Sequence, residues 1–291
     1  MSEIEPYIVG VGELLWDIHG EKRTPGGAPF NFAFHCNQLG HPAAMVSRVG
    51  TDQLGTELVR DVKKLGMSEA WIQVDPIHPT GTVDVIVDEA GQPDYSITPD
   101  VAWDYLEPLS FPQAKVVCFG TLAQRHPVAR NSIRRFLERE QNALIVCDLN
   151  LREPLWAPRV IGESLRVARW LKLNADELQT VRRYLGLLPM SESAMLAELR
   201  SRYHLELICL TKGVDGAIVQ TASEEVSEPG IPIQLIDTVG AGDAFTAALV
   251  CLTLEGKSLR ESVRFANQLA ARVASSEGGT PILNRQEWES Q

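Results

Sequence analysis

Strand-like and helix-like segments alternate along most of this chain, and this alternation restricts the possible folds more than any other feature. The strand-like segments are short and apolar, and they cover 7–11, 43–49, 116–119, 144–148, 171–173 and 207–211. The helix-like segments cover 29–39, 52–65, 128–141, 159–168, 176–185, 191–203, 242–254 and 258–275. Short buried strands between helices are typical of a parallel sheet with helices on both faces. We therefore predict an α/β fold in which ligands bind at the carboxyl ends of the strands.

Residues 71–105 depart from this alternation. They read as strand, turn and strand, with alternating polar and apolar residues at 82–87 and a turn at 89–93. No helical pattern separates the strands, so we expect a small antiparallel sheet that projects from the main domain. Such an appendage can serve as a lid over a site, with 80–98 as its hairpin. An ordinary edge hairpin explains the same residues equally well.

The charge of the chain opposes two classes of partner. The 291 residues contain 27 Lys and Arg against 38 Asp and Glu, a formal net charge of −11. A chain this acidic lacks the basic surface that attracts proteins to nucleic acid or to anionic membranes. Its length fits one large α/β domain or two smaller ones. We expect neither a nucleic-acid nor a membrane partner.

The five cysteines and the chain start indicate a cytoplasmic protein. The cysteines form no CxxC pair and have no metal-ligand spacing, so we interpret them as buried apolar residues in a reducing compartment. The acidic start lacks the pattern of a signal peptide. The longest apolar stretch, 244–254, is about half the ~20 residues that a membrane helix needs.

The strongest chemical motif is Asp-Thr-Val-Gly-Ala-Gly-Asp at 237–243, directly before an apolar helix. Its small residues, 240–242, let backbone N–H groups approach a ligand at a helix N-terminus, where anions bind favourably. Asp243 falls in the first helical turn, where the helix dipole favours an ionised carboxylate. That carboxylate suits the removal of a proton from a hydroxyl that attacks a phosphate. A helix cap behind a glycine loop explains the motif about as well.

Three further features suit a sugar site. Gly27 and Asn31 belong to a glycine-rich helix start at 26–31, and an Asn side chain both donates to and accepts from a polyol. Asp17 lies after the first strand, where its carboxylate can accept two sugar hydroxyls. Arg152 follows a strand end and can pair with a carbonyl, carboxylate or phosphate. The structural alternatives are a surface-loop Asp and a surface ion pair.

Two strand ends suit a nucleotide. Asn174 and Glu177 open a helix, and carboxylates there can hold Mg²⁺ through waters, although the same pair also suits a capping box. Residues 211–216 end another strand with two glycines that permit a turn around phosphate or ribose, or a plain hairpin. The six histidines show no ligand spacing that would predict a tightly bound transition metal.

Taken together, these motifs resemble the ribokinase-like carbohydrate kinases, also called the phosphofructokinase B (PfkB) family. Three signatures occur in order, at 26–31, at 49–55 (Val-Gly-Thr-Asp-Gln-Leu-Gly) and at 237–243. The wording Asp-Leu-Asn-Leu-Arg at 148–152 is similar to the fructokinase and 2-keto-3-deoxygluconate kinase branches, and 12–17 resembles the fructokinase start. The resemblance covers almost the whole chain.

The resemblance implies a single three-layer α/β/α domain over 1–291, with a mostly parallel sheet and a β lid formed mainly by 71–105 and 13–28. It implies ATP-dependent phosphorylation of a sugar, with fructose converted to fructose 6-phosphate as our first hypothesis. The alternatives within the family are 2-keto-3-deoxygluconate kinase, ribokinase and nucleoside kinase. A non-catalytic relative that binds a sugar or a nucleotide would have lost the base or the glycines, which this chain retains. Lids in this family also pair between subunits, so a homodimer is an open expectation.

The resemblance also implies a role for each motif residue. Asp243 is the catalytic base, beside an anion hole formed by Gly240, Ala241 and Gly242. The sugar would be held by Asp17, Gly27, Asn31 and Arg152. The residues expected to bind ATP are Asn174, Thr211, Gly213, Gly216 and Asn267, with Glu177 reaching Mg²⁺ through water. Asp237 and Val239 match positions that bind a monovalent cation, but the second half of that loop, 275–279, departs from the usual Arg-Pro-Gly-Ala wording and leaves potassium activation open.

Overall fold

The computed structural model describes residues 7–87, 93–108, 111 and 113–283, and a large sheet runs through the centre of this part of the chain. The strand order is β13-β12-β11-β10-β9-β8-β1-β4-β5. Neighbouring strands are parallel except at β11–β12 and β12–β13, which are antiparallel. The strands are β1 (Ile8–Val11), β4 (Ala43–Gly50), β5 (Ile72–Asp75), β8 (Val116–Phe119), β9 (Leu144–Asp148), β10 (Trp170–Asn174), β11 (Leu207–Thr211), β12 (Ala217–Thr221) and β13 (Glu225–Glu228).

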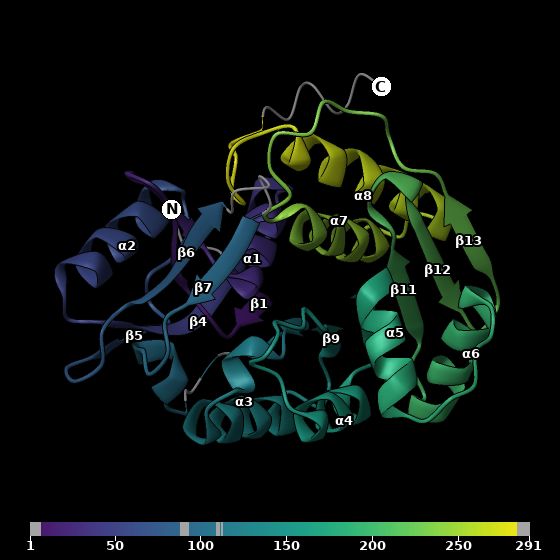
Figure 1. Cartoon of the computed structure of the whole chain (residues 1–291), viewed down its shortest axis with the longest axis horizontal. Helices are drawn as coiled ribbons and strands as arrows, with labels where there is room; N and C mark the ends of the chain where they lie inside the picture. The colour runs from purple at the N-terminus through teal and green to yellow at the C-terminus, as the bar shows by residue number, and fades with distance from the viewer. Residues whose placement is uncertain (1–6, 88–92, 109–110, 112, 284–291) are drawn as a thin grey trace.

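Helices cover both faces of this sheet. The α-helices are α1 (Ala28–Gln38), α2 (Gln53–Lys64), α3 (Pro127–Arg139), α4 (Pro158–Val167), α5 (Ala175–Tyr184), α6 (Glu192–Tyr203), α7 (Ala241–Leu254) and α8 (Leu259–Ala274). Short 3₁₀ turns are η1 (Ala102–Tyr105), η2 (Leu122–Gln124) and η3 (Gly213–Asp215). In Figure 1, α7 and α8 lie above the sheet, and α3 and α4 lie below it. The eight expected helices are confirmed to within two residues at each end. Within the described residues, no helix is both long enough and apolar enough to cross a bilayer.

Two hydrophobic cores, one on each face, explain why the strands are almost wholly apolar. Successive strand residues point to opposite faces, so Val9 and Val11 join the core under α3–α6, whereas Ile8 joins the core under α1, α2, α7 and α8. β1 is buried at every position because it is an interior strand, flanked by β8 and β4 and covered by helices on both faces. The predicted mostly parallel sheet with helices on both faces is confirmed.

A second, four-stranded sheet projects from the large one. It consists of β2 (Leu15–His19), β3 (Lys22–Gly26), β6 (Gly81–Val87) and β7 (Pro93–Ile97), in the order β3-β2-β6-β7. The hairpin pairs β2–β3 and β6–β7 are antiparallel, whereas β2 and β6 are parallel, so the expectation of a purely antiparallel sheet is wrong. Most of the turn expected at 89–93 lies outside the described residues.

Two further expectations need correction. β5 falls in the segment assigned to the small sheet, but it pairs in parallel with β4 at the edge of the large sheet. Here α2 provides the crossover of an ordinary βαβ unit, which ends with β5. Asp17 lies buried on strand β2, within the segment 13–28 that was assigned to the β lid, so the alternative of a surface-loop Asp is wrong. The hairpin of β12 and β13 had no counterpart in the sequence analysis.

The signature at 49–55 joins the base of the small sheet to the large sheet. Asp52 caps α2 by accepting from Gly55 N, and the same Oδ1 accepts from Thr80 Oγ1 at 2.6 Å. Oδ2 of Asp52 accepts from Thr80 N at 2.8 Å, and Gly50 N donates to Thr80 Oγ1 at 3.0 Å. Because Thr80 directly precedes β6, this motif fixes the point from which the second hairpin of the small sheet starts.

Thr80→Val is expected to destabilise the fold by about 1–3 kcal/mol. Thr80 is buried, and the variant leaves the Gly50 N–H without its acceptor while the side chain keeps its shape. Urea unfolding measures the loss. Thr56→Val on exposed α2 surface serves as the matched control. Equal stability of the two variants would show that the Thr80 hydroxyl does not anchor the small sheet.

Candidate active site

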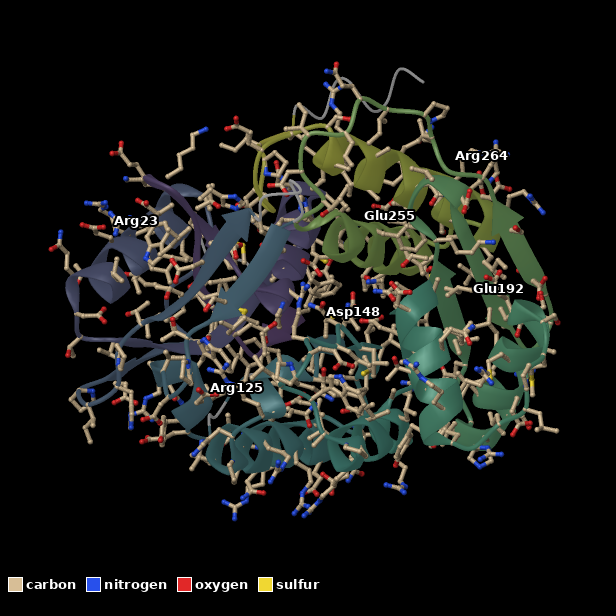
Figure 2. The ribbon with its side chains drawn as sticks, in the orientation of Figure 1. Arg23, Arg125, Asp148, Glu192, Glu255 and Arg264 are labelled. Carbon is tan, nitrogen blue, oxygen red and sulfur yellow. The ribbon has the colours of Figure 1, made fainter. Side chains whose placement is uncertain are left out.

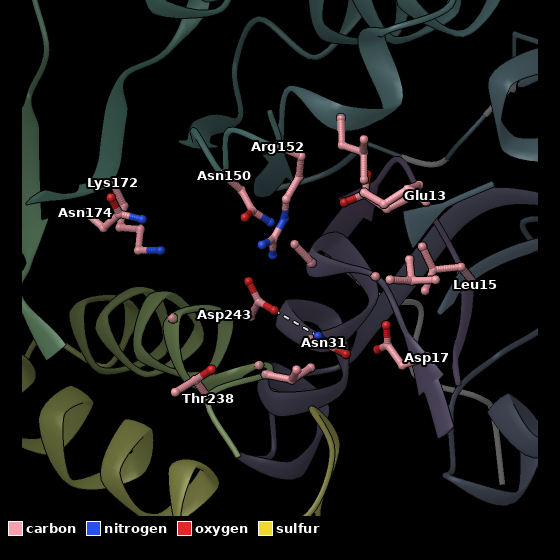
Figure 3. A pocket seen from close by; sticks show the side chains of 18 of the residues that line it. Glu13, Leu15, Asp17, Asn31, Asn150, Arg152, Lys172, Asn174, Thr238 and Asp243 are labelled. Atoms are coloured by element: carbon pink, nitrogen blue, oxygen red, sulfur yellow. Dashed lines mark hydrogen bonds between the residues drawn. The ribbon is translucent and has the colours of Figure 1, made fainter. Parts of the chain in front are cut away.

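A cavity of about 260 Å³ opens where the carboxyl ends of the parallel strands meet the small sheet. Figure 3 shows Lys172 and Asn174 on one side of it, Leu15 and Asp17 on the other, and Asp243 with Asn31 between them. Ten of the residues singled out in the sequence line this cavity: Asp17, Gly27, Asn31, Arg152, Asn174, Thr211, Val239, Gly240, Gly242 and Asp243. Segments that are more than 200 residues apart in the chain therefore meet at one site.

The N-terminus of α7 lies at the wall of the cavity. Gly240 is its N-cap residue, with a left-handed φ of 76° and no side-chain cap. A Cβ at Gly240 would lie 2.5 Å from the backbone of Gly279, so both the conformation and the packing require glycine. A helix start leaves first-turn N–H groups that the helix ladder does not use, although the Ala241 N–H donates to Thr238 O at 3.4 Å. This geometry suits an anion.

Asp243 is held beside this helix start by a side chain from α1. Its Oδ2 accepts from Asn31 Nδ2 at 2.8 Å, and both residues are buried. Asp243 is the third residue of α7, not its cap, so the alternative reading of the motif as a helix cap is wrong. Burial raises the pKa of Asp243 to about 6, and the charge of Asp148 adds to that rise, against the lowering effects of Lys172 and Asn31.

A buried lysine lies against the glycine turn at the start of α7, Gly240–Gly242. Lys172 Nζ donates to Asp148 Oδ1 at 3.0 Å, and Thr246 Oγ1 donates to Oδ2 of the same carboxylate at 3.0 Å. A Cβ at Gly242 would lie 2.8 Å from Lys172 Nζ, so the absence of a side chain there lets the ammonium group approach the helix start. Figure 2 shows Asp148 near the centre of the molecule.

Lys172 keeps its positive charge in spite of burial. Burial alone would lower its pKa, but the negative charges of Asp148, Glu177 and Asp243 outweigh that effect and raise the pKa above its ordinary value. The sequence analysis did not select Lys172. The available signal was a charged residue in the middle of an apolar strand, Trp-Leu-Lys-Leu-Asn at 170–174.

Two carboxyl groups, Glu13 and Asp17, lie at the end of the cavity formed by the small sheet. Asp17 Oδ2 lies against Gly26, where a side chain would overlap it. Burial raises the pKa of both Glu13 and Asp17 to about 7. The positive charge of the Arg152 guanidinium partly offsets these rises, and it also lowers the pKa of Asp243. This end of the site therefore combines three acids with one permanent cation.

Asn174 and Glu177 form a reciprocal capping box at the start of α5. Glu177 N donates to Asn174 Oδ1 at 2.9 Å, and Asn174 N donates to Glu177 Oε2 at 2.8 Å. Oε1 of Glu177 accepts from Leu151 N at 2.8 Å, which fixes the segment that carries Arg152. Asn174 lines the cavity, whereas Glu177 lies behind it, so the capping alternative describes this pair in the structure.

Of the four remaining nucleotide candidates, one lines the cavity and three do not. Thr211 lines it, but Gly213 and Gly216 belong to the turn that follows β11 and do not. Asn267 on α8 donates through Nδ2 to Pro229 O at 3.1 Å, so its amide supports the segment after β13. The structure thus brings only part of the expected nucleotide set together at the cavity.

Asp237 joins the two loops that were expected to form a cation site. Its Oδ1 accepts from Val239 N and its Oδ2 from Gly278 N, each at 3.0 Å. Its own N–H donates to Ala274 O at 3.2 Å. The segment 275–279 therefore packs beside the glycine turn at the start of α7, although its sequence differs from the usual family motif. In the part of the chain that the structure describes, no three His, Cys, Asp or Glu side chains form a metal-binding group.

Comparison with known proteins identifies a family and a curated relative. The model of the pfkB family carbohydrate kinases matches residues 5–285. The chain is 29% identical over 300 residues to probable fructokinase-4 of Arabidopsis thaliana. This match covers 97% of this chain and 91% of that protein.

Two solved structures share the fold. One is a fructokinase with bound ATP from Xylella fastidiosa, with a TM-score of 0.86, 21% identity and coverage of 97% of each chain. The other is a fructokinase from Vibrio cholerae bound to fructose, ADP and a potassium ion, with a TM-score of 0.85 and 23% identity, covering 100% of this chain and 99% of that one. The ribokinase-like fold implied by the motifs is confirmed.

Proposed function

The chain belongs to the pfkB family of carbohydrate kinases, and from that premise we propose that it phosphorylates fructose with MgATP to give fructose 6-phosphate. The family membership makes the protein a phosphotransferase that acts on a sugar hydroxyl. The choice of fructose draws on the relatives that are named fructokinases and on the wording of residues 12–17 and 148–152.

The observation that carries the choice of acceptor class is the acidic end of the cavity. Glu13, Asp17 and Asp243 are buried there and offer carboxyl oxygens to a ligand, opposite a single guanidinium. A neutral polyol fits this set because its hydroxyls donate to carboxylates. A sugar acid would add a fourth negative charge next to acids whose pKa values burial has already raised. This favours fructose or ribose over 2-keto-3-deoxygluconate.

In the proposed reaction, Asp243 accepts the proton of the attacking hydroxyl. The hydroxyl oxygen forms a bond to the γ-phosphorus of ATP while the bond to the bridging oxygen breaks, and ADP leaves. The N–H groups at Gly240–Gly242 and the ammonium of Lys172 stabilise the negative charge of the transferred group. Asp17, Gly27 and Asn31 orient the sugar, and Arg152 lies at the rim of the same half.

We further propose that Mg²⁺ enters with ATP. When bound, Mg²⁺ neutralises charge on the phosphates. Both oxygens of Glu177 already accept N–H groups, and each retains a second lone pair, so this residue fits the metal only through water, a mode that Mg²⁺ favours. Asn174, Thr211, Gly213, Gly216 and Asn267 are the proposed nucleotide contacts. A potassium ion held near Asp237 and Val239 is a further proposal, supported by the joined loops.

The small sheet is the proposed lid. The cavity is lined by Leu15, Asp17, Val83 and Ile97 from its strands, which supports a role for this sheet in excluding water from the transfer step. From the family resemblance, we also propose that two copies pair through these sheets as a homodimer, which sedimentation can test. All five cysteines are buried and unpaired, which supports the proposed cytoplasmic location.

Fructose is expected to give the highest kcat/KM in a coupled ADP-release assay with MgATP. The panel contains fructose, ribose, 2-keto-3-deoxygluconate, a nucleoside and an aldohexose, because these separate the alternatives within the family. A preference for the keto-deoxy acid would contradict the argument from the acidic end of the cavity. If no acceptor of the panel causes ADP release, the result would favour a non-catalytic relative.

A further inference from the structure

Glu13 is a buried charged group for which neither the motifs nor the proposed mechanism supplies a specific role. It lies between β1 and β2, it is 1% exposed, and it lines the cavity together with Asp17 and Arg152. Figure 3 shows Glu13 across the cavity from Lys172 and Asn174, with its carboxyl pointing inward on the side of Arg152. Glu13 thus belongs, with Asp17 and Arg152, to the half of the cavity in which the sugar is proposed to bind, here called the acceptor half.

The contacts of Glu13 leave one oxygen for a ligand. Its own N–H and that of Ala28, the first residue of α1, interact with the carboxyl and lower its pKa. Among the residues that the structure describes, none forms a hydrogen bond with Oε2 of Glu13. A carboxyl oxygen that is buried without a partner is costly, and such a group in a cavity wall is therefore well suited to meet a polar ligand atom.

We propose that Glu13 is a specificity-determining residue that binds one hydroxyl of the acceptor sugar, a hydroxyl other than the one that is phosphorylated. The inference rests on the proposed function, because it needs a polyol in the acceptor half. The reacting hydroxyl must lie at Asp243, which Asn31 holds beside the start of α7. Glu13 lies on the side of Arg152, so it contacts a different part of the same sugar.

The electrostatic surroundings agree with this role in either protonation state. Burial, together with the charge of Asp243, raises the pKa of Glu13 to about 7, against the lowering effect of Arg152. An ionised carboxylate accepts a bond from a sugar hydroxyl, and a protonated one donates to it. The hydrogen bond therefore persists across neutral pH.

The competing explanation is that Glu13 only supports the start of α1. Such a residue would affect stability and the position of Gly27, but it would not distinguish one sugar hydroxyl from another. Acceptors that each lack a single hydroxyl can distinguish a ligand-binding role of Glu13 from a purely structural one. A site that hydrogen-bonds a given hydroxyl rejects the analogue without it, because the protein group then stays unpaired.

The test measures kcat and KM for the best acceptor and for its monodeoxy analogues, with the wild type, Glu13→Gln and Glu13→Ala. In the wild type, removal of the hydroxyl that Glu13 binds is expected to lower kcat/KM about 10- to 100-fold. In Glu13→Ala this penalty is expected to shrink at least tenfold, through KM, while the penalties for the other hydroxyls stay unchanged. If the Ala variant does not fold, Glu13→Gln provides the comparison, because it preserves the volume of the side chain and an acceptor oxygen. In Glu13→Gln the penalty for the missing hydroxyl is expected to shrink about threefold.

Glu140→Gln is the matched control. Glu140 is a buried carboxyl that accepts from Ala114 N at 3.0 Å and does not line the cavity, so its variant should keep the wild-type pattern of penalties. If Glu13 variants lose stability or activity but keep every penalty of the wild type, the residue is structural and the inference is overturned. If the wild type phosphorylates no sugar at all, the proposed function fails first and the inference fails with it.

Discussion

Asp243→Asn is expected to lower kcat by about 10²- to 10⁴-fold while the fold and sugar binding remain close to those of the wild type. The loss corresponds to about 3–5 kcal/mol of barrier, the usual range for removal of a general base. An Asn side chain cannot accept the proton of the attacking hydroxyl. Its amide oxygen can still accept the hydrogen bond from Asn31 Nδ2, so the connection between α7 and α1 is retained.

The measurement is kcat together with the thermal midpoint of the purified variant. A role in capping α7 would leave both unchanged, since Asn caps helices about as well as Asp, but the structure already excludes that role because Gly240 is the N-cap. A kcat within a few-fold of the wild-type value would remove Asp243 from the chemistry. A binding measurement with the sugar separates a lost base from a distorted site.

The pH profile provides a second test of the same assignment. Asp243 must be ionised to act as a base, and its pKa is raised to about 6, so kcat/KM is expected to fall as the pH drops through about 6. Glu13 and Asp17, with pKa values of about 7, lie in the same half of the cavity. The apparent pKa of the acid limb therefore belongs to the cluster and not to one residue. Activity that stays constant down to pH 4.5 would contradict a base with a raised pKa.

Lys172→Met is expected to lower both stability and turnover. The variant leaves the Asp148 carboxylate buried, with Thr246 as its one remaining side-chain hydrogen-bond donor among the described residues. Removal of one partner of a buried ion pair typically lowers the free energy of unfolding by about 3–5 kcal/mol. It also removes a positive charge beside Gly242, and loss of one group that stabilises transition-state charge costs about 10²- to 10³-fold in kcat. Urea unfolding and single-turnover kinetics measure the two effects.

A second substitution separates these two contributions. Lys172→Met combined with Asp148→Asn removes the unpaired buried charge, so most of the lost stability should return. The rate should stay low, because no cation lies beside the glycine turn at the start of α7. Recovery of kcat in the double variant would show that Lys172 acts only by neutralising Asp148 and stabilising the fold.

The sequence by itself determined the class of fold and the centre of the site. The short, continuous apolar runs predict strands that are buried on both faces, and the helical patterns predict helices with one apolar face. This combination is typical of a parallel sheet with helices on both sides. The motif at 237–243 needs no distant partner to form a glycine turn at a helix start, since its local conformation depends on its own residues. For that reason a glycine turn at a helix start could be predicted without a structure, and α7 does begin directly after Gly240.

Only the tertiary structure decided which side chains share the cavity. Glu13 and Lys172 come from segments that are more than 150 residues apart, and the one local signal, a charged residue within an apolar strand at Lys172, does not show which cavity that residue lines. The same applies to the edge strand β5 and to Asp17 on β2, whose places depend on which strand each one pairs with. Burial, charge and free hydrogen-bonding groups are properties of the assembled surroundings. The pKa values of Glu13, Asp17 and Asp243 are raised because the fold removes water from them, and no stretch of sequence contains that information.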